Sequence, residues 1–183
     1  MAEDIKALLA KTFAPYQALS EVQLDALQSH YDLLSTWNKK LNLWRVQDVR
    51  EAVEFHYCES LYLAHMLPAG PLKIVDVGSG GGFPGFPVGI LRPECEVDLL
   101  ESDQRKAAFL REACHEHPNL HVVASRAEDC TKRYDWMISR AVRSETVESL
   151  PLAPNCALLT STPSPDKLPW GENRFIRMFH VEL

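Results

Sequence analysis

The sequence has no long hydrophobic run. Nowhere in its 183 residues is there a stretch approaching the roughly 18 apolar residues that a membrane-spanning helix needs. The first residues, MAEDIKALLAK, also lack the segments of a signal peptide. We therefore expect no membrane partner and a cytoplasmic location.

Cysteine is scarce and scattered. No two cysteines form a CxxC pair, which argues against a disulfide framework and against a zinc knot; the five are Cys58, Cys95, Cys114, Cys130 and Cys156. The segment Cys114–His117, with His121 beyond it, has no second ligand pair at zinc spacing. The sequence therefore predicts free thiols in a reducing compartment and no metal site.

The sequence has no excess of cationic charge. It contains 19 Lys and Arg residues and 25 Asp and Glu residues, so its net charge is −6. This balance disfavours indiscriminate binding to nucleic acid. The stretch WNKKLNLWR (37–45) is a local exception. Its Trp37 fits the apolar side of a helix, whereas Lys39, Lys40, Trp44 and Arg45 are either solvated surface residues or contacts for RNA phosphates and bases.

The chain divides near the Pro68–Pro71 turn. In residues 1–70 the pattern is helical: Ser20 and Gln23 form a capping box for a helix with an apolar stripe to about Leu41, and Asp48 caps a second helix. We expect this region to be a helical extension packed on the rest of the chain, so that the whole forms one compact unit.

Residues 71–183 alternate between strand and helix patterns. The predicted strands cover 72–77, 96–101, 120–124, 135–139, 156–161 and 173–183, and helical segments follow the first, second and fourth. This alternation predicts an α/β fold with a mostly parallel, doubly wound, Rossmann-like sheet. Ligands of such sheets bind at the carboxyl ends of the strands, so the residues after each strand are the candidate site.

The first strand leads into a glycine cluster in VDVGSGGGFPGFPVGI (75–90). Gly78 and Gly80 allow positive φ and the close approach of a ligand. Glu101 ends the second strand, where a carboxylate can accept hydrogen bonds from a ribose diol. These features alone fit either NAD or S-adenosyl-L-methionine.

Two acidic positions favour S-adenosyl-L-methionine over a dinucleotide. Asp76 would crowd a pyrophosphate but suits a cofactor that bears ammonium and sulfonium groups. Ala127 and Glu128 lie in the acidic turn SRAED after the third strand, which suits an adenine edge. The residues therefore favour a methyl-donor pocket.

Five motifs in order resemble the glucose-inhibited division protein B family: LLSTWNKKLNL, IVDVGSGGGFPGFPVGI, LLESDQRKAAFLRE, SRAED and ISRAV. The resemblance implies a class I methyltransferase that uses S-adenosyl-L-methionine and modifies N7 of a guanine in 16S ribosomal RNA. It implies 16S ribosomal RNA or the small ribosomal subunit as partner, and we expect a monomer. It places Gly78, Phe83, Glu101, Ala127 and Glu128 beside the cofactor, and Arg140 between cofactor and substrate.

No Ser/His/Asp or Cys/His constellation is evident in the sequence. Guanine N7 is an unprotonated lone pair, so its methylation needs no general base, and we predict no particular catalytic residue. The chain departs from the family after CALLTS (156–161), where a proline-rich stretch replaces a further helix, and at Glu59, where the family pattern has aspartate. The alternatives are therefore a non-catalytic or regulatory relative that binds the cofactor, or a methyltransferase for another substrate.

Overall fold

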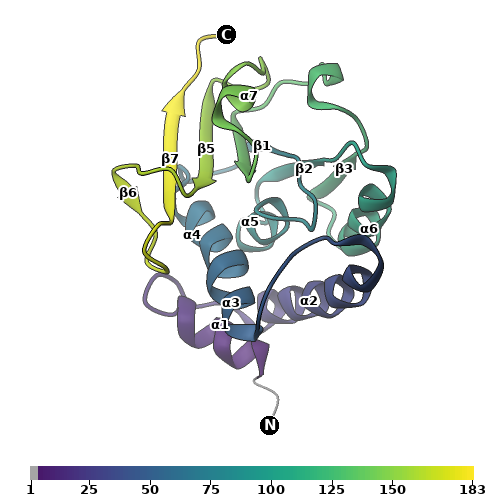
Figure 1. Ribbon diagram of the computed structural model, residues 1–183, viewed down its shortest axis with the longest axis vertical. Coiled ribbons are helices and arrows are strands. Elements are labelled where there is room, and N and C mark those ends of the chain that lie inside the picture. The colour runs from purple at the N-terminus through teal and green to yellow at the C-terminus, as the bar shows by residue number, and fades with distance from the viewer. Residues whose placement is uncertain (1–3) are drawn as a thin grey trace.

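The computed structural model describes residues 4–183, and its N-terminal part is helical (Figure 1). The helices there are α1 (Ile5–Phe13), α2 (Glu21–Leu41), α3 (Val49–Ala52), the π-helical segment η1 (Val53–Cys58) and α4 (Glu59–Met66). The capping box is confirmed: Gln23 N donates to Ser20 Oγ and Ser20 N donates to Gln23 Oε1. The second predicted helix also forms, but it contains the π-helical turn, which the sequence pattern did not indicate.

The remainder of the chain forms a seven-stranded sheet with the order β3-β2-β1-β4-β5-β7-β6. Its strands are β1 (Lys73–Val77), β2 (Glu96–Leu100), β3 (Leu120–Val123), β4 (Trp136–Arg140), β5 (Asn155–Thr160), β6 (Asp166–Lys167) and β7 (Phe175–His180). Strands β1 to β5 are parallel, and β7 runs antiparallel to both β5 and β6. The predicted mostly parallel sheet is confirmed.

The helices of the sheet region lie on its two faces. Two helices, α5 (Gly85–Leu91) and α6 (Gln104–Cys114), pack with the N-terminal helices on one face. The other face is covered by the short α7 (Ser144–Glu148) and by loops, and the turn η2 (Ala127–Asp129) adjoins it. Strands β2 and β3 are added on one side of β1, and β4 and β5 on the other. The switch point of this doubly wound sheet therefore lies between β1 and β4, beside the glycine loop.

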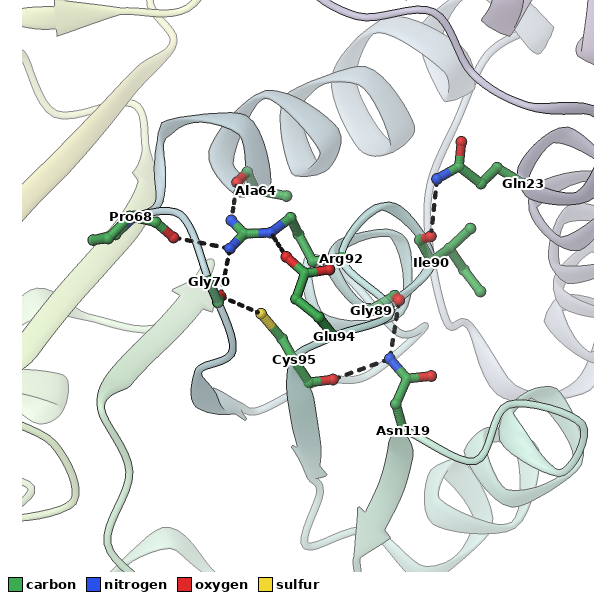
Figure 2. Close-up of polar contacts among 10 residues, drawn as sticks. All are labelled: Gln23, Ala64, Pro68, Gly70, Gly89, Ile90, Arg92, Glu94, Cys95 and Asn119. Carbon is green, nitrogen blue, oxygen red and sulfur yellow. Dashed lines mark hydrogen bonds and ion pairs between the residues drawn. The ribbon is translucent and has the colours of Figure 1, made fainter.

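One hydrophobic core joins the N-terminal helices to the sheet. Leu27 and Leu34 of α2 lie in the same buried cluster as Phe86 of α5 and Phe109 of α6. A polar contact reinforces this junction, because the Arg92 guanidinium donates to the carbonyls of Ala64, Pro68 and Gly70 at 3.2, 2.8 and 2.9 Å (Figure 2). The helical region therefore shares its buried surface with the sheet.

The C-terminal region is short. After β5 the chain passes through residues 161–165 into the two-residue strand β6, and no helix separates β5 from β7 (Figure 1). The sequence-based expectation that a helix is missing here is confirmed. In the part of the chain that is described, none of the helices combines the length and the apolar character needed to cross a membrane.

Candidate active site

The glycine loop connects β1 to α5, and several of its glycines have a left-handed backbone conformation. Gly78 and Gly80 have φ of 72° and 56°, a region that glycine enters without steric cost. The amides of Gly78 and Ser79 both donate to Leu100 O, at 2.9 and 3.1 Å. Gly80 N donates to Glu101 Oε2 over 2.9 Å. The loop is therefore anchored to the end of β2 by three main-chain donors.

Asp76, in β1, accepts hydrogen bonds from the glycine loop and from the start of α5. Its side chain is fully buried, and its Oδ2 accepts from Ser79 Oγ at 2.7 Å and from Gly85 N at 2.8 Å. Burial raises the pKa of this carboxyl to about 7, and Oδ1 has no hydrogen-bond partner in the protein. The contact between Asp76 and a cofactor stays a prediction; the carboxylate lies beneath α5, where Gly85 N at the start of that helix donates to it.

Glu101 and the turn after β3 line one cavity of about 280 Å³, here called the Glu101 cavity. It is lined by Val77, Gly78, Leu100, Glu101, Ser102, Ser125, Arg126, Ala127, Glu128, Thr146 and Leu150. Glu101 Oε1 accepts from Asp103 N at 2.9 Å, so each carboxylate oxygen has one main-chain donor and free lone pairs for a hydroxyl. The fold thus brings three predicted residues to one cavity, although they are separated in sequence: Glu101, Ala127 and Glu128.

A second cavity of about 220 Å³, the Trp44 cavity, lies on the other side of Gly78. It is lined by Leu43, Trp44, His56, Gly78, Ser79, Gly80, Gly81, Phe83, Arg140 and Ala141. Trp44 is only 7% exposed, and its ring stacks on Phe83 with centroids 5.9 Å apart and an interplanar angle of 11°. Trp44 is therefore part of a cavity wall, and its contact with RNA stays a prediction.

The π-helical segment η1 gives Arg140 its anchor. The amide of Glu59 donates to the carbonyls of Glu54 and His56, which leaves Phe55 O free for side chains. Arg140 Nη1 donates to Phe55 O at 2.7 Å and to His56 Nδ1 at 3.0 Å. Burial lowers the pKa of His56 to about 3, so its ring is neutral at neutral pH, and Nδ1 accepts because the Arg140 guanidinium can only donate.

Arg174 joins the same cluster from the loop before β7. Its Nη2 donates to Phe55 O at 3.3 Å and to Glu59 Oε2 at 2.7 Å, and its Nε donates to Glu59 Oε1. Burial lowers the pKa of Arg140 to about 10, which still leaves the guanidinium charged at neutral pH. Two cations thus face one carboxylate, and the cluster carries one uncompensated positive charge.

Arg140 and Arg174 line a third cavity of about 380 Å³, here called the arginine cavity. It is lined by Glu59, Arg140, Ala141, Val142, Arg143, Leu159, Thr160, Ser161 and Arg174. It shares Arg140 and Ala141 with the Trp44 cavity, which in turn shares Gly78 with the Glu101 cavity. The three cavities therefore form a continuous line along the carboxyl ends of the strands.

The remaining predicted residues lie outside this line. Lys39, Lys40 and Arg45 are exposed and line none of the three cavities. Two residues that sequence reasoning overlooked are Arg174 and His30, whose partners lie 115 and 51 positions away in the chain. No local sequence pattern could have indicated either contact. Among residues 4–183, no three His, Cys, Asp or Glu residues are grouped to hold a metal ion.

The family model for rRNA small subunit methyltransferase G (GidB) matches residues 23–151. The chain belongs to this family. Among curated relatives, ribosomal RNA small subunit methyltransferase G of Chromobacterium violaceum is 40% identical over 127 residues, covering 67% of this chain and 60% of that protein. Its counterpart in Acetivibrio thermocellus is 34% identical over 134 residues, covering 69% and 55%. The chain thus spans 55 to 60% of the length of these family members.

A likeness to a solved structure extends over nearly the whole chain. A Plasmodium falciparum protein described as a protein-L-isoaspartate O-methyltransferase, in complex with S-adenosyl-L-homocysteine, aligns with a TM-score of 0.51. The two are 11% identical, and the alignment covers 99% of this chain and 96% of the other. This likeness concerns the fold alone.

Proposed function

We propose that this protein transfers a methyl group from S-adenosyl-L-methionine to N7 of a guanine in 16S ribosomal RNA. The observation that carries the proposal is the line of three cavities, which meet at Gly78 and at Arg140, in a chain of this family. The proposed partner is 16S ribosomal RNA or the small ribosomal subunit. The protein would act on it as a monomer in the cytoplasm.

The residues present fit the proposed cofactor. The free lone pairs of Glu101 suit the ribose hydroxyls, and Ala127 and Glu128 suit the adenine edge. Gly78 lines both adjoining cavities, and a Cβ there would lie 3.1 Å from Val142 Cγ2. A side chain at Gly78 would therefore press on Val142, in the wall of the arginine cavity. Gly80 and Phe83 line the Trp44 cavity, and Asp76 holds their loop.

The reaction requires little of the protein beyond orientation. S-adenosyl-L-methionine supplies an electrophilic methyl group on a sulfonium. Guanine N7 has a free lone pair, so no residue has to remove a proton from it. The residues need to hold the nitrogen, methyl carbon and sulfur in line, an effect worth several kcal/mol, about 7 to 11 in the best-oriented reactions. Three aromatic rings form one wall of that space, those of Trp44, Phe83 and His56.

The arginine cavity is our candidate for the substrate side. Its surplus positive charge suits an RNA phosphate or a cofactor carboxylate, and Arg140 lies where the arginine cavity joins the Trp44 cavity. Lys39, Lys40 and Arg45, outside the cavities, are candidates for more distant phosphate contacts. The short C-terminal region leaves a second candidate function, a relative that binds the cofactor without methylating RNA, because no helix lies between β5 and β7.

One experiment separates these candidates. The protein is incubated with labelled S-adenosyl-L-methionine and with unmethylated small subunits or 16S RNA, and 7-methylguanine is mapped by chemical strand scission. We expect label at one guanine of the RNA. Cofactor binding without label in RNA would support the non-catalytic alternative, and absence of cofactor binding would refute both.

A further inference from the structure

A buried histidine connects helix α2 to the glycine loop. His30 is 2% exposed, and its Nε2 lies 3.0 Å from Gly81 O, in the loop between Gly80 and Gly82. Its Nδ1 lies 2.7 Å from the hydroxyl of Tyr57, in η1. One imidazole thus contacts the loop and the π-helical segment at once.

The hydrogen-bond partners assign a tautomer to this ring. A carbonyl oxygen can only accept, so Nε2 carries the proton and donates to Gly81 O. Nδ1 then accepts from the Tyr57 hydroxyl. Burial lowers the pKa of His30 to about 3, so the ring is neutral at physiological pH. It is also held by stacking on Phe86, with centroids 4.2 Å apart and planes at 17°.

The glycine loop packs closely against side chains of α2. At Gly82 an added Cβ would lie 2.9 Å from His30 Nε2, and at Gly81 it would lie 3.3 Å from Leu34 Cδ1. Gly80 and Gly81 of this loop also line the Trp44 cavity. The position of His30 therefore fixes the position of the cavity wall formed by Gly80 and Gly81.

We propose that His30 is a positioning residue, which fixes the cofactor-binding conformation of the glycine loop through its hydrogen bond to Gly81 O. This inference rests on the proposed function, because it assumes that the loop receives S-adenosyl-L-methionine. When the donor is lost, Gly81 O is left without its partner and the loop occupies other conformations. The measured dissociation constant then rises by the inverse of the competent fraction.

Two amide variants differ by one methylene and separate the donor from the packing. In H30Q the side-chain amide reaches Gly81 O, whereas in H30N it is too short and remains near Tyr57. We expect the dissociation constant for S-adenosyl-L-homocysteine, measured by isothermal titration calorimetry, to rise about fivefold in H30N, which corresponds to the loss of one buried hydrogen bond of about 1 kcal/mol. In H30Q we expect a change of less than about threefold on the same scale.

Y57F is the matched control, because it removes the other hydrogen bond of the same ring and leaves the donor to Gly81 in place. It should lower the urea midpoint about as much as H30N does, with a dissociation constant close to that of the wild type. Equal binding by folded H30N and wild type would overturn the proposal, as would equal weakening in H30N, H30Q and Y57F. Wild-type protein that binds no S-adenosyl-L-homocysteine would refute the proposed function and this inference with it. Should H30N not fold, binding by H30Q that is weakened more than about fivefold also overturns the proposal.

Discussion

The amide of Gly80 and the carboxylate of Glu101 are joined by a 2.9 Å hydrogen bond, so the loop after β1 is tied to the acid that ends β2. A second donor, Asp103 N, holds the other carboxylate oxygen. Glu101 thus combines two functions in our proposal, since it orients the loop and presents its remaining lone pairs to the Glu101 cavity.

E101Q should therefore weaken the binding of S-adenosyl-L-homocysteine. The amide has one acceptor oxygen in place of two, so it loses one loop contact and the charge that strengthens a bond to a hydroxyl. Hydrogen bonds to charged groups contribute about 1.5 to 3 kcal/mol, so the dissociation constant should rise about 10- to 100-fold in calorimetry. A dissociation constant within about twofold of wild type would remove Glu101 from the proposed cofactor site.

G78V should abolish cofactor binding. Gly78 lines two cavities and has φ of 72°, so a valine there is strained, and its Cβ would lie 3.1 Å from Val142 Cγ2. The matched control is G70A: Gly70 also has positive φ, 95°, but an added Cβ meets nothing within 4 Å. Both variants should lose about 1 to 2 kcal/mol of stability from left-handed strain, and only G78V should lose binding. Normal binding by G78V would show that the cofactor lies elsewhere.

Sequence periodicity was sufficient for six of the seven strands and for a mostly parallel sheet, but it missed the two-residue β6 in the proline-rich stretch. It also did not show on which face of β1 Asp76 lies. Side chains alternate along a strand, so Asp76 shares a face with Ile74, under α5, and the opposite face carries Val75 and Val77. Spacing located the carboxylate near the loop but did not show the direction in which it points.

Contacts between distant segments could not be predicted in the same way. Trp44 lies among cations in the sequence, a pattern typical of an RNA surface, yet its ring packs on Phe83. Glu59 pairs with Arg174, which the sequence pattern placed in a strand over 173–183 and which lies just before β7, 115 positions from Glu59. Such pairs depend on how the N-terminal helices and the C-terminal hairpin pack on the sheet, and a single sequence does not encode that packing in local patterns.

Asp76 should make a pH-dependent contribution to stability. Its pKa is raised from 3.8 to about 7 by burial, so between these values the folded state binds more protons than the unfolded state, and this contribution to stability falls as the pH rises. The buried neutral histidines act in the opposite sense, since their lowered pKa values make stability rise with pH up to about 6.5. Both proteins contain the histidines, so the difference in stability between wild type and D76N reports the contribution of the Asp76 carboxyl alone. In urea unfolding, the free energy of unfolding of D76N minus that of the wild type should increase from pH 4 to pH 7. A difference that does not change with pH would contradict the raised pKa of Asp76.

R174A should destabilise the fold strongly, because it removes the ion-pair partner that donates to both oxygens of Glu59, whose side chain is 1% exposed. Removing one partner of a buried ion pair costs about 3 to 5 kcal/mol. The control is R50A, since Arg50 Nη1 lies 3.9 Å from Glu54 Oε1 in a pair where Arg50 is 64% exposed. That surface pair should contribute less than about 1 kcal/mol. Similar losses of unfolding free energy in the two variants would show that Glu59 is not an isolated buried charge once Arg174 is removed.

The double variant K39A/K40A should weaken RNA binding without affecting the cofactor. Both lysines are exposed at the end of α2 and line none of the three cavities, so their charge can reach only the RNA outside the methyl-transfer site. Each phosphate contact that is lost should reduce the slope of log K against log salt concentration by about 1, so two contacts reduce it by about 2. The slope is measured by filter binding of 16S RNA over a salt series, with S-adenosyl-L-homocysteine calorimetry as the control. An unchanged slope would show that the RNA does not reach the end of α2, and a changed cofactor affinity would show that the lysines act through the cavities.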